Sequence, residues 1–162
     1  MKKNKKKDEK APNPIIVTHH EARRDYFVID TMEAGIVLAG CEVKSLRTSN
    51  ASLSGSFART EGNELFLYNL YIAPYAMGNR ENPETKRPRK LLLHKQQILR
   101  VRAKMQEKGL ALIPLKLYFN HGIVKVELAV CKGKNHYDKR QDMKKDSARR
   151  EIDRAIKNRN RK

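Results

Sequence analysis

The chain has few of the residues on which several protein classes depend. Its two cysteines, Cys41 and Cys131, lie far apart and outside any C-x-x-C pair, which argues against a disulfide framework or a cysteine-built zinc site. No apolar run approaches the roughly 20 residues of a membrane-spanning helix, and residues 1–10 lack the apolar stretch of a signal peptide. We therefore expect a soluble, cytoplasmic protein that has no contact with a membrane.

The chain also lacks the usual catalytic and cofactor motifs. Its five histidines show no H-E-x-x-H spacing, and neither G-x-x-x-x-G-K-[ST] nor G-x-G-x-x-G is present to hold a nucleotide phosphate. Neighbouring positions on a strand point to opposite faces, so one metal ion could hardly bind both His19 and His20. Glu33 and Glu42 could form an acid/base pair, although structural ion pairing is the commoner role of carboxylates in so basic a protein. The sequence thus indicates a protein without enzymatic activity, cofactor or metal.

Positive charge is in large excess and is concentrated at the two ends of the chain. Lysine and arginine number 36 against 18 aspartates and glutamates in 162 residues, a net charge of +18. Residues 1–14 carry six lysines against two acidic residues, and residues 132–162 carry thirteen basic residues against five acidic ones. Such self-repulsion is offset when a polyanion binds, and clustered lysine and arginine favour nucleic acid over a role in solubility alone.

The charge pattern divides the chain into three parts. Residues 1–14 are predicted to be a disordered basic arm, residues 15–131 a folded domain, and residues 132–162 a basic C-terminal tail. The tail is rich in helix-forming residues, but Met143, Ile152 and Ile156 are too few to anchor it on the domain. We expect the tail to be disordered in isolation and to fold into a helix when a partner neutralises it.

The central part is mainly β, because apolar residues alternate with polar ones at a period of two. Pro114 has no N–H, which places an edge or a bulge in its strand, and Asn120-His121-Gly122 forms a hairpin turn. The predicted strands are 26–30, 35–38, 65–72, 112–119 and 123–130, and the predicted helices are 42–47 and 95–108, the latter followed by Gly109 as its C′ residue. These elements predict an OB-like antiparallel β-barrel with two or three flanking helices, with an open α+β sheet as the alternative.

Two basic segments are candidate RNA contacts. Residues 86–90 place four cations in five positions and can neutralise several phosphates, unless they form only a solvated face. Leu91-Leu92-Leu93 follows at once, and three consecutive leucines on a regular element cannot all point inward, so one is expected to be exposed unless a bend buries all three. Residues 132–140 combine cations with a glycine hinge and the rings of His136 and Tyr137, which can stack on unpaired bases. This composition favours single-stranded or bulged RNA.

Several blocks of residues match, in order, the pattern of one known family. The blocks are Glu33-Ala34-Gly35-Ile36, Gly40 with Glu42-Val43-Lys44-Ser45-Leu46-Arg47, Arg89-Lys90-Leu91-Leu92-Leu93, residues 109–115, and Gly133-Lys134 followed by Tyr137-Asp138-Lys139-Arg140. Together they are far more specific than any one block, and they extend from about Tyr26 to the C-terminus. In these blocks the chain resembles small protein B, the SsrA-binding family that partners tmRNA in bacterial trans-translation.

The resemblance implies an RNA-binding adaptor with an OB-like barrel. Proteins of this family bind the tRNA-like domain of tmRNA, where the barrel occupies the place of a missing anticodon arm, and help to bring it with elongation factor Tu to stalled ribosomes. We expect a monomer with these partners. The tmRNA-binding residues that the resemblance implies in this chain are Glu33, Lys44, Arg47, Arg89, Lys90, Leu92, His94, His19 and His20.

The resemblance also implies a role for the tail on the ribosome. In the family the tail enters the decoding centre and the empty mRNA channel, where it contacts small-subunit rRNA and folds into a helix. The residues implied here are Lys132, Gly133, Lys134, Tyr137, Asp138, Lys139, Arg140, Ile152 and Ile156. The expected function is therefore delivery of tmRNA to stalled ribosomes for ribosome rescue and peptide tagging.

The chain departs from the family pattern at three places. His19-His20 stands where the family usually has Asn before a basic residue, and His94 stands where Asn is frequent. Because histidine titrates near neutrality, RNA contacts at these positions would depend on pH. Asn135 replaces a second lysine after Gly133, which removes one phosphate contact from the tail.

Two other functions are open from the residues alone. A ribosomal or ribosome-assembly protein would use the basic ends to bind rRNA permanently. An RNA-modifying enzyme or nuclease would need a nucleophile or a metal cluster, for which the sequence offers no plausible candidate.

Overall fold

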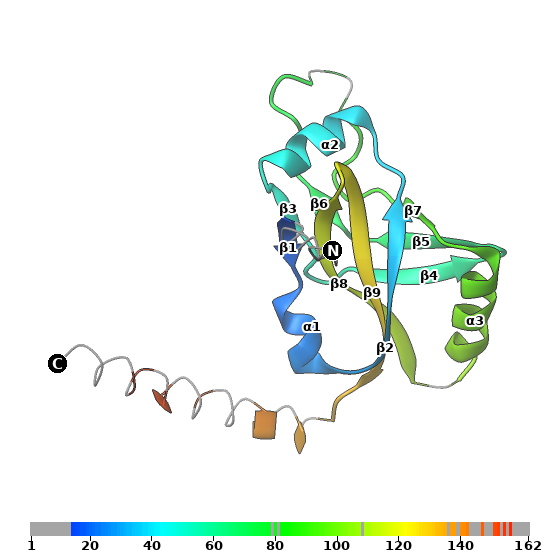
Figure 1. Cartoon of the computed structure of the whole chain (residues 1–162), viewed down its shortest axis with the longest axis vertical. Coiled ribbons are helices and arrows are strands. Elements are labelled where there is room, and N and C mark those ends of the chain that lie inside the picture. Colours follow the sequence, from blue (N-terminus) through cyan, green and yellow to red (C-terminus); the bar gives the residue numbers. More distant parts are fainter. Residues whose placement is uncertain are drawn as a thin grey trace, which may run out of the picture.

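The computed structural model describes residues 14–78, 80, 82–107 and 109–135, and then only residues 137, 138, 140–142, 147, 151, 152, 154 and 156. Within these residues, nine strands and three helices have defined bounds (Figure 1). The elements are β1 (Ile15–Thr18), α1 (His20–Asp25), β2 (Tyr26–Ile36), α2 (Gly40–Arg47), β3 (Ala51–Ser52), β4 (Phe57–Glu61), β5 (Glu64–Tyr68), β6 (Tyr71–Ile72), β7 (Arg89–Leu92), α3 (Lys95–Met105), β8 (Leu110–Asn120) and β9 (Ile123–Gly133).

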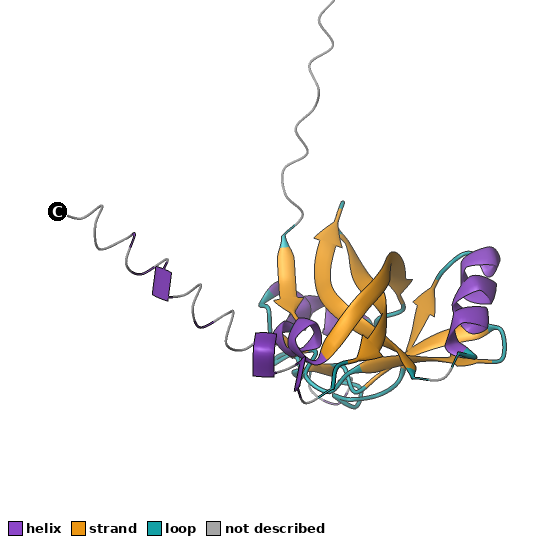
Figure 2. Cartoon of the chain, turned by 90° about the horizontal axis from the view of Figure 1, so that it is seen from below, coloured by secondary structure: helices purple, strands orange, loops and turns teal. Residues whose placement is uncertain are grey.

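Six antiparallel strands form a closed ring. They pair in the order β8-β4-β5-β7-β2-β9, and β9 pairs back with β8. The remaining edge of β8 is shared, since β4 pairs with it at Leu112 and β1 pairs with it at Lys116, Leu117 and Tyr118. Strands β3 and β6 form a separate two-stranded sheet. The ring confirms the expected OB-like, mainly β architecture over an open α+β sheet, because closure leaves each ring strand with a neighbour on both sides (Figure 2).

The alternation seen in the sequence places the core inside this ring. In β9, Val124, Val126, Leu128 and Val130 are at most 4% exposed, whereas Lys125 and Glu127 between them are only half-buried. Leucines of β5, β7 and β8 join the same apolar cluster, and Val101 packs on it from α3. Helix α3 thus closes one side of the ring with few apolar residues.

A smaller apolar cluster lies between α1 and strands β8 and β9. Ala22 of α1 packs there with Ile113, Leu115, Ala129 and Cys131. Cys131 is fully buried, and burial raises the pKa of its thiol to about 11, so that it packs as a small apolar side chain. This cluster holds α1 against the outer surface of the ring.

The two backbone features predicted for β8 and β9 are present. The hairpin turns through His121 and Gly122, both at positive φ, the conformation that favours glycine at the second position. The β8–β9 register slips between Pro114 and Lys116, so the proline lies at a bulge, where the lack of an N–H breaks no ladder hydrogen bond.

Other predicted bounds were wrong. Residues 26–36 form one strand instead of two, because the residues between the two predicted strands, Thr31 to Ala34, pair in regular register with β9. The strand predicted over 65–72 is split by Asn69, whose positive φ turns the chain between β5 and β6. Helix α3 ends at Met105, so Gly109 is not its C′ residue, although its φ of +85° is one that favours glycine.

Five elements were not predicted. Strands β1, β3, β4 and β7 and helix α1 are short, and a short element shows too few repeats of its period to stand out in sequence. The last two residues of the basic segment 86–90 begin β7. The predicted arm of residues 1–14 lies outside the described residues except for Pro14, whose carbonyl accepts a hydrogen bond from the Phe119 N–H at 3.0 Å. No helix in the described part of the chain is long and apolar enough to cross a membrane.

Candidate RNA-binding surface

An open groove lies where β2, the end of β7 and the start of α3 meet. Its volume is about 610 Å³, and it brings together three residues that the family resemblance implied, Glu33, Leu92 and His94. The groove is lined by Thr31, Met32, Glu33, Gly35, Leu92, Leu93, His94, Gln97 and Lys125. Three segments far apart in sequence, residues 31–35, residues 92–97 and Lys125 of β9, thus supply apolar, acidic, basic and amide groups to one surface.

Leu92 gives the groove an exposed apolar side chain. Strand β7 alternates, so Leu91 points into the core at 2% exposure while Leu92 is 51% exposed. The expectation that one of the three leucines is exposed is confirmed. Gly35 lies directly opposite Leu92 in the β2–β7 register, and a Cβ at Gly35 would come within 3.2 Å of the Leu92 Cβ. The absence of a side chain at Gly35 therefore leaves room for Leu92.

Glu33 is held at the groove by neighbours on two strands. Lys125 Nζ of β9 lies 3.3 Å from Glu33 Oε1, and the Tyr118 hydroxyl of β8 donates a hydrogen bond to Glu33 Oε2. Burial, followed by the hydrogen bond to Glu33, raises the pKa of the Tyr118 phenol, so Tyr118 remains a donor. The carboxylate itself is 44% exposed and can accept further hydrogen bonds from a ligand.

Glu42 has a different environment, at the base of α2. It is 3% exposed and accepts hydrogen bonds from Arg89 Nε at 2.8 Å, from Arg87 Nη2 at 2.6 Å and from the Ala39 N–H at 2.8 Å. Burial alone would raise the pKa of Glu42, but the hydrogen bonds from Arg87 and Ala39 and the charge of Arg89 hold the pKa below its usual value. Structural ion pairing, the commoner role, is confirmed for this carboxylate.

Arg89 does not lie on the surface, where an RNA contact was predicted for it. Arg89 is fully buried, and its guanidinium also donates to the carbonyls of Leu70, Thr85 and Arg87. The alternation of β7 turns Arg89 inward with Leu91, and Lys90 outward with Leu92. The basic run therefore contributes one interior arginine that organises the fold. Lys90 is 43% exposed and pairs with Glu64 of β5 at the surface.

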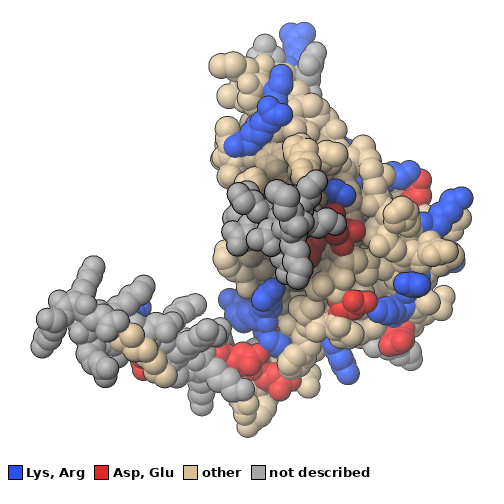
Figure 3. Space-filling model, in the orientation of Figure 1, with Lys and Arg blue, Asp and Glu red and all other residues tan. Residues whose placement is uncertain are grey.

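Helix α2 presents a second basic surface. Lys44 and Arg47 are exposed, and Lys44 Nζ lies 5.4 Å from the centre of the Tyr75 ring. The Ser45 hydroxyl donates to the Ala73 carbonyl at 2.6 Å, so the segment after β6 is fastened to α2. Figure 3 shows a few separate lysine and arginine side chains on a mostly uncharged surface at this end of the molecule, whereas acidic and basic groups mix over α3. Lys44 and Arg47 do not line the groove of Glu33 and Leu92.

The two adjacent histidines have different environments. His19 precedes α1, is 8% exposed, and its Nδ1 donates to the Pro114 carbonyl at 3.0 Å. The His19 ring is therefore not the exposed group that was expected at this position. His20 begins α1 and is exposed, so these residues do not continue a strand as the sequence suggested.

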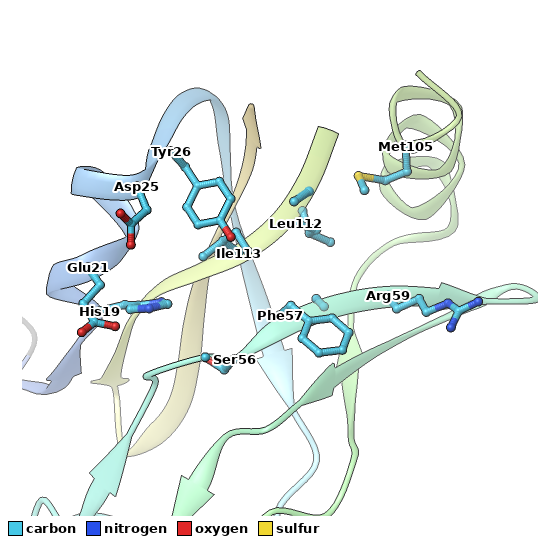
Figure 4. Close-up of a pocket in the computed structure, with 13 residues that line it drawn as sticks. His19, Glu21, Asp25, Tyr26, Ser56, Phe57, Arg59, Met105, Leu112 and Ile113 are labelled. Atoms are coloured by element: carbon cyan, nitrogen blue, oxygen red, sulfur yellow. The ribbon is translucent and has the colours of Figure 1, made fainter. Parts of the chain in front are cut away.

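His19 also lines a cavity of about 430 Å³ that was not predicted from sequence (Figure 4). Tyr26 and Asp25 approach it from the junction of α1 and β2, and Phe57 and Arg59 approach it from β4. Phe57 stacks on Tyr68 with their ring centres 5.4 Å apart. Because its walls come from α1, β4, α3 and β8, no local motif could have revealed this cavity. Among the described residues, no group of three or more His, Cys, Asp or Glu side chains is placed to hold a metal ion.

Lys134 marks the junction between the ring and the tail. Its backbone N–H donates to the Asp25 carbonyl at 3.0 Å, and its Nζ donates to the Arg23 carbonyl and to Asp142 Oδ2, both at 2.7 Å. The Nζ also lies 4.9 Å from the centre of the Phe27 ring. The Lys134 side chain is only 8% exposed, so in this structure it fastens the start of the tail to α1 and β2.

The other tail residues differ in how far the structure describes them. Lys132 and Gly133 end β9 and are exposed. Asp138 is partly buried and Arg140 is exposed, and the apolar side chains of the tail are exposed as well: Tyr137 at 71%, Ile152 at 60% and Ile156 at 53%. Lys139 and His136 lie outside the described residues.

The sequence matches known proteins over most of its length. A family model described as SmpB protein matches residues 16–158. An SsrA-binding protein from Pelotomaculum thermopropionicum is 56% identical over 145 residues, which cover 90% of this chain and 95% of the relative. Another SsrA-binding protein, from Desulforamulus reducens, is 57% identical over 145 residues, which cover 89% of this chain and 90% of the relative.

The fold has a solved counterpart. A structure described as "tmRNA-SmpB: a journey to the center of the bacterial ribosome" is similar with a TM-score of 0.65 and 50% sequence identity, covering 85% of this chain and 96% of the other. The sequence match thus extends over the ring and into the tail, and the fold match covers most of the chain. The chain belongs to the SmpB family of SsrA-binding proteins.

Proposed function

We propose that this protein is an RNA-binding adaptor that binds the tRNA-like domain of tmRNA and delivers it to stalled ribosomes for peptide tagging. The observation that carries the proposal is the groove at β2, β7 and α3, which gathers Glu33, Leu92 and His94 on the fold of a family whose members are SsrA-binding proteins. The groove is open and chemically mixed, as expected of a surface that contacts base edges and ribose as well as phosphate.

Within this proposal the groove and its surroundings divide the work of RNA binding. Leu92 packs on a base or ribose, while Glu33 and His94 form hydrogen bonds. Lys90, Lys44 and Arg47 are exposed or partly exposed cations on β7 and α2, and they neutralise phosphates that flank the groove. His20 belongs to this set as an exposed group, whereas the buried His19 and Arg89 do not.

The tail is proposed to act on the ribosome. Residues 132–162 carry thirteen basic residues against five acidic ones, and the exposed Tyr137, Ile152 and Ile156 have apolar surface that a partner can cover. The tail enters the decoding centre and the empty mRNA channel, contacts small-subunit rRNA there and forms a helix. Residues 15–131 are then the tmRNA-binding domain, and residues 1–14 a basic arm.

The remaining partners follow from the same role. Elongation factor Tu accompanies the complex during delivery, and the adaptor acts in the cytoplasm as a monomer. Such an adaptor binds and positions RNA, so it needs no bond-forming chemistry of its own. A permanent ribosomal protein is not favoured, because the relatives that cover nine-tenths of the chain are SsrA-binding proteins.

Ending the chain after Asn135 tests this division of labour. The shortened chain keeps the whole ring and Lys134, so we expect its affinity for the tRNA-like domain to stay within about twofold of the full chain. Peptide tagging of stalled translation products should be lost, because the ribosome-binding segment is absent. Loss of RNA affinity together with tagging, or tagging without the tail, would contradict the proposal.

A further inference from the structure

Tyr118 lies behind the RNA-binding groove without lining it. It is 8% exposed on β8, and its register partner on β9 is Lys125. The Tyr118 hydroxyl donates to Glu33 Oε2, and Lys125 Nζ lies 3.3 Å from Glu33 Oε1. Side chains on β8 and β9 thus hold the two oxygens of one carboxylate that projects from β2.

The Tyr118 ring is itself fixed in place. Lys116 Nζ lies 5.5 Å from the centre of this ring and 2.7 Å from Glu127 Oε2. A buried phenol with neighbours on both sides loses little further freedom when it donates a hydrogen bond. A glutamate side chain that is 44% exposed would otherwise sample several rotamers, and ordering it on binding would cost affinity.

The phenol also constrains Glu33 without adding positive charge. Burial and the adjacent carboxylate raise the pKa of Tyr118, so the hydroxyl stays protonated and donates at any physiological pH. A carboxylate repels phosphate and accepts hydrogen bonds, so a fixed Glu33 favours the N–H groups of bases and the ribose 2′-hydroxyl.

We propose that Tyr118 is a positioning residue for RNA recognition, which holds Glu33 in the orientation that accepts hydrogen bonds from base or ribose donors of tmRNA. Tyr118 itself does not touch the RNA. This inference rests on the proposed function, in which the groove binds the tRNA-like domain.

The Tyr118→Phe variant of the full chain tests the inference, because it keeps the aromatic ring of residue 118 and removes only the hydroxyl. We expect about a tenfold weaker affinity for the tRNA-like domain, and unchanged affinity for an unrelated RNA hairpin of equal length. Tyr68→Phe is the matched control, since the Tyr68 hydroxyl also donates to a glutamate, Glu61, away from the groove. This control should leave both affinities unchanged.

A double-mutant cycle shows whether Tyr118 acts through Glu33. In the Glu33→Ala background, Tyr118→Phe should cause no further loss, whereas equal losses in both backgrounds would overturn the inference. The Glu33→Asp variant tests the same hydrogen bond without changing Tyr118. The shorter aspartate side chain no longer reaches the Tyr118 hydroxyl, so the affinity for the tRNA-like domain should fall about as far as in Tyr118→Phe. An unchanged affinity in Glu33→Asp would also overturn it.

The two proposals fail in different ways. If the unaltered chain binds the tRNA-like domain no better than the hairpin, the proposed function is wrong, and the role of Tyr118 fails with it. If the unaltered chain shows the preference and Tyr118→Phe retains it in full, only the role of Tyr118 is wrong.

Discussion

At the scale of single residues, one buried carboxylate organises the base of α2. Glu42 holds Arg87 and Arg89 by hydrogen bonds of 2.6–3.1 Å, and Arg89 in turn donates to three backbone carbonyls. Removing one partner of a buried ion pair leaves the other charge without compensation, which costs about 3–5 kcal/mol. Glu42 is therefore expected to matter for stability far more than for RNA contact.

Replacing Glu42 by alanine should lower the free energy of unfolding by about 3 kcal/mol at pH 7. The pKa of Glu42 is lowered in the folded state, so its contribution is complete above the unfolded-state pKa and is lost as the pH falls through the folded-state value. The difference between Glu42→Ala and the unaltered chain should thus shrink steadily below about pH 4. Urea unfolding from pH 7 to pH 3 measures this, and a difference that is independent of pH would contradict it.

Leu92 and Leu99 form a matched pair, because both are exposed, at 51% and 59%, but only Leu92 lines the groove. Leu92→Ala should weaken binding to the tRNA-like domain about fivefold to tenfold, since packing on one base contributes about 1–3 kcal/mol. Leu99→Ala should leave binding unchanged, and neither variant should shift the melting temperature by more than about 2 °C. Equal effects of both variants on binding would remove the groove from the interface.

Arg89 and His19 show what sequence alone could not decide at this scale. Counting cations in residues 86–90 takes no account of the direction of each side chain, and that direction depends on where β7 begins. For Leu92, the same alternation was enough to predict exposure of one leucine. His19 is buried because α1 packs over the β8 bulge, a tertiary contact that no local pattern reveals.

At the scale of elements, the end of β9, the end of α1 and the start of the tail meet at Lys134. The Arg23 carbonyl lies in the last turn of α1, where backbone carbonyls have no N–H donor within the helix, and the Lys134 ammonium donates to it instead. Asp142 and the Phe27 ring complete its surroundings. These contacts fasten the start of the tail to α1 and β2.

Lys134→Ala should therefore loosen the junction without weakening the groove. We expect faster amide exchange at the Lys134 N–H and through α1, and a loss of about 1–2 kcal/mol of unfolding free energy. The neighbouring exposed Lys132 is the control, and Lys132→Ala should change neither quantity. If both variants exchange alike, the contacts of Lys134 do not hold the junction.

The elements themselves were partly predictable. Long strands with a regular period, β8 and β9, were recognised, as were the hairpin at Gly122 and the bulge at Pro114. Helix α1 has six residues with only Ala22 buried, so it carries almost no periodic signal. Asn69 interrupts an apolar run through a positive φ, a backbone property that its neighbours in sequence do not indicate.

At the scale of the whole molecule, the closed ring supports a groove built from three segments that are distant in sequence, residues 31–35, residues 92–97 and Lys125. The tail adds further positive charge outside this ring. The OB-like class was predictable because several alternating strands in about 115 residues have few other ways to bury their faces. The groove itself was implied only by the family resemblance, since Glu33, Leu92 and His94 come together through the β2–β7 pairing. Two of its lining residues, Gln97 and Lys125, were missed.

The central claim is that the ring recognises the tRNA-like domain specifically, beyond the attraction of a chain with a charge of +18 for any polyanion. The most direct test is the affinity of the full chain, from low to moderate salt, for the tRNA-like domain, an ordinary elongator tRNA and an unrelated hairpin of equal length. We predict that all three affinities fall as salt rises while a preference of at least about a hundredfold for the tRNA-like domain persists, because the groove contacts do not depend on counterion release. Equal affinities that fall together would contradict the account and identify a generic polyanion binder.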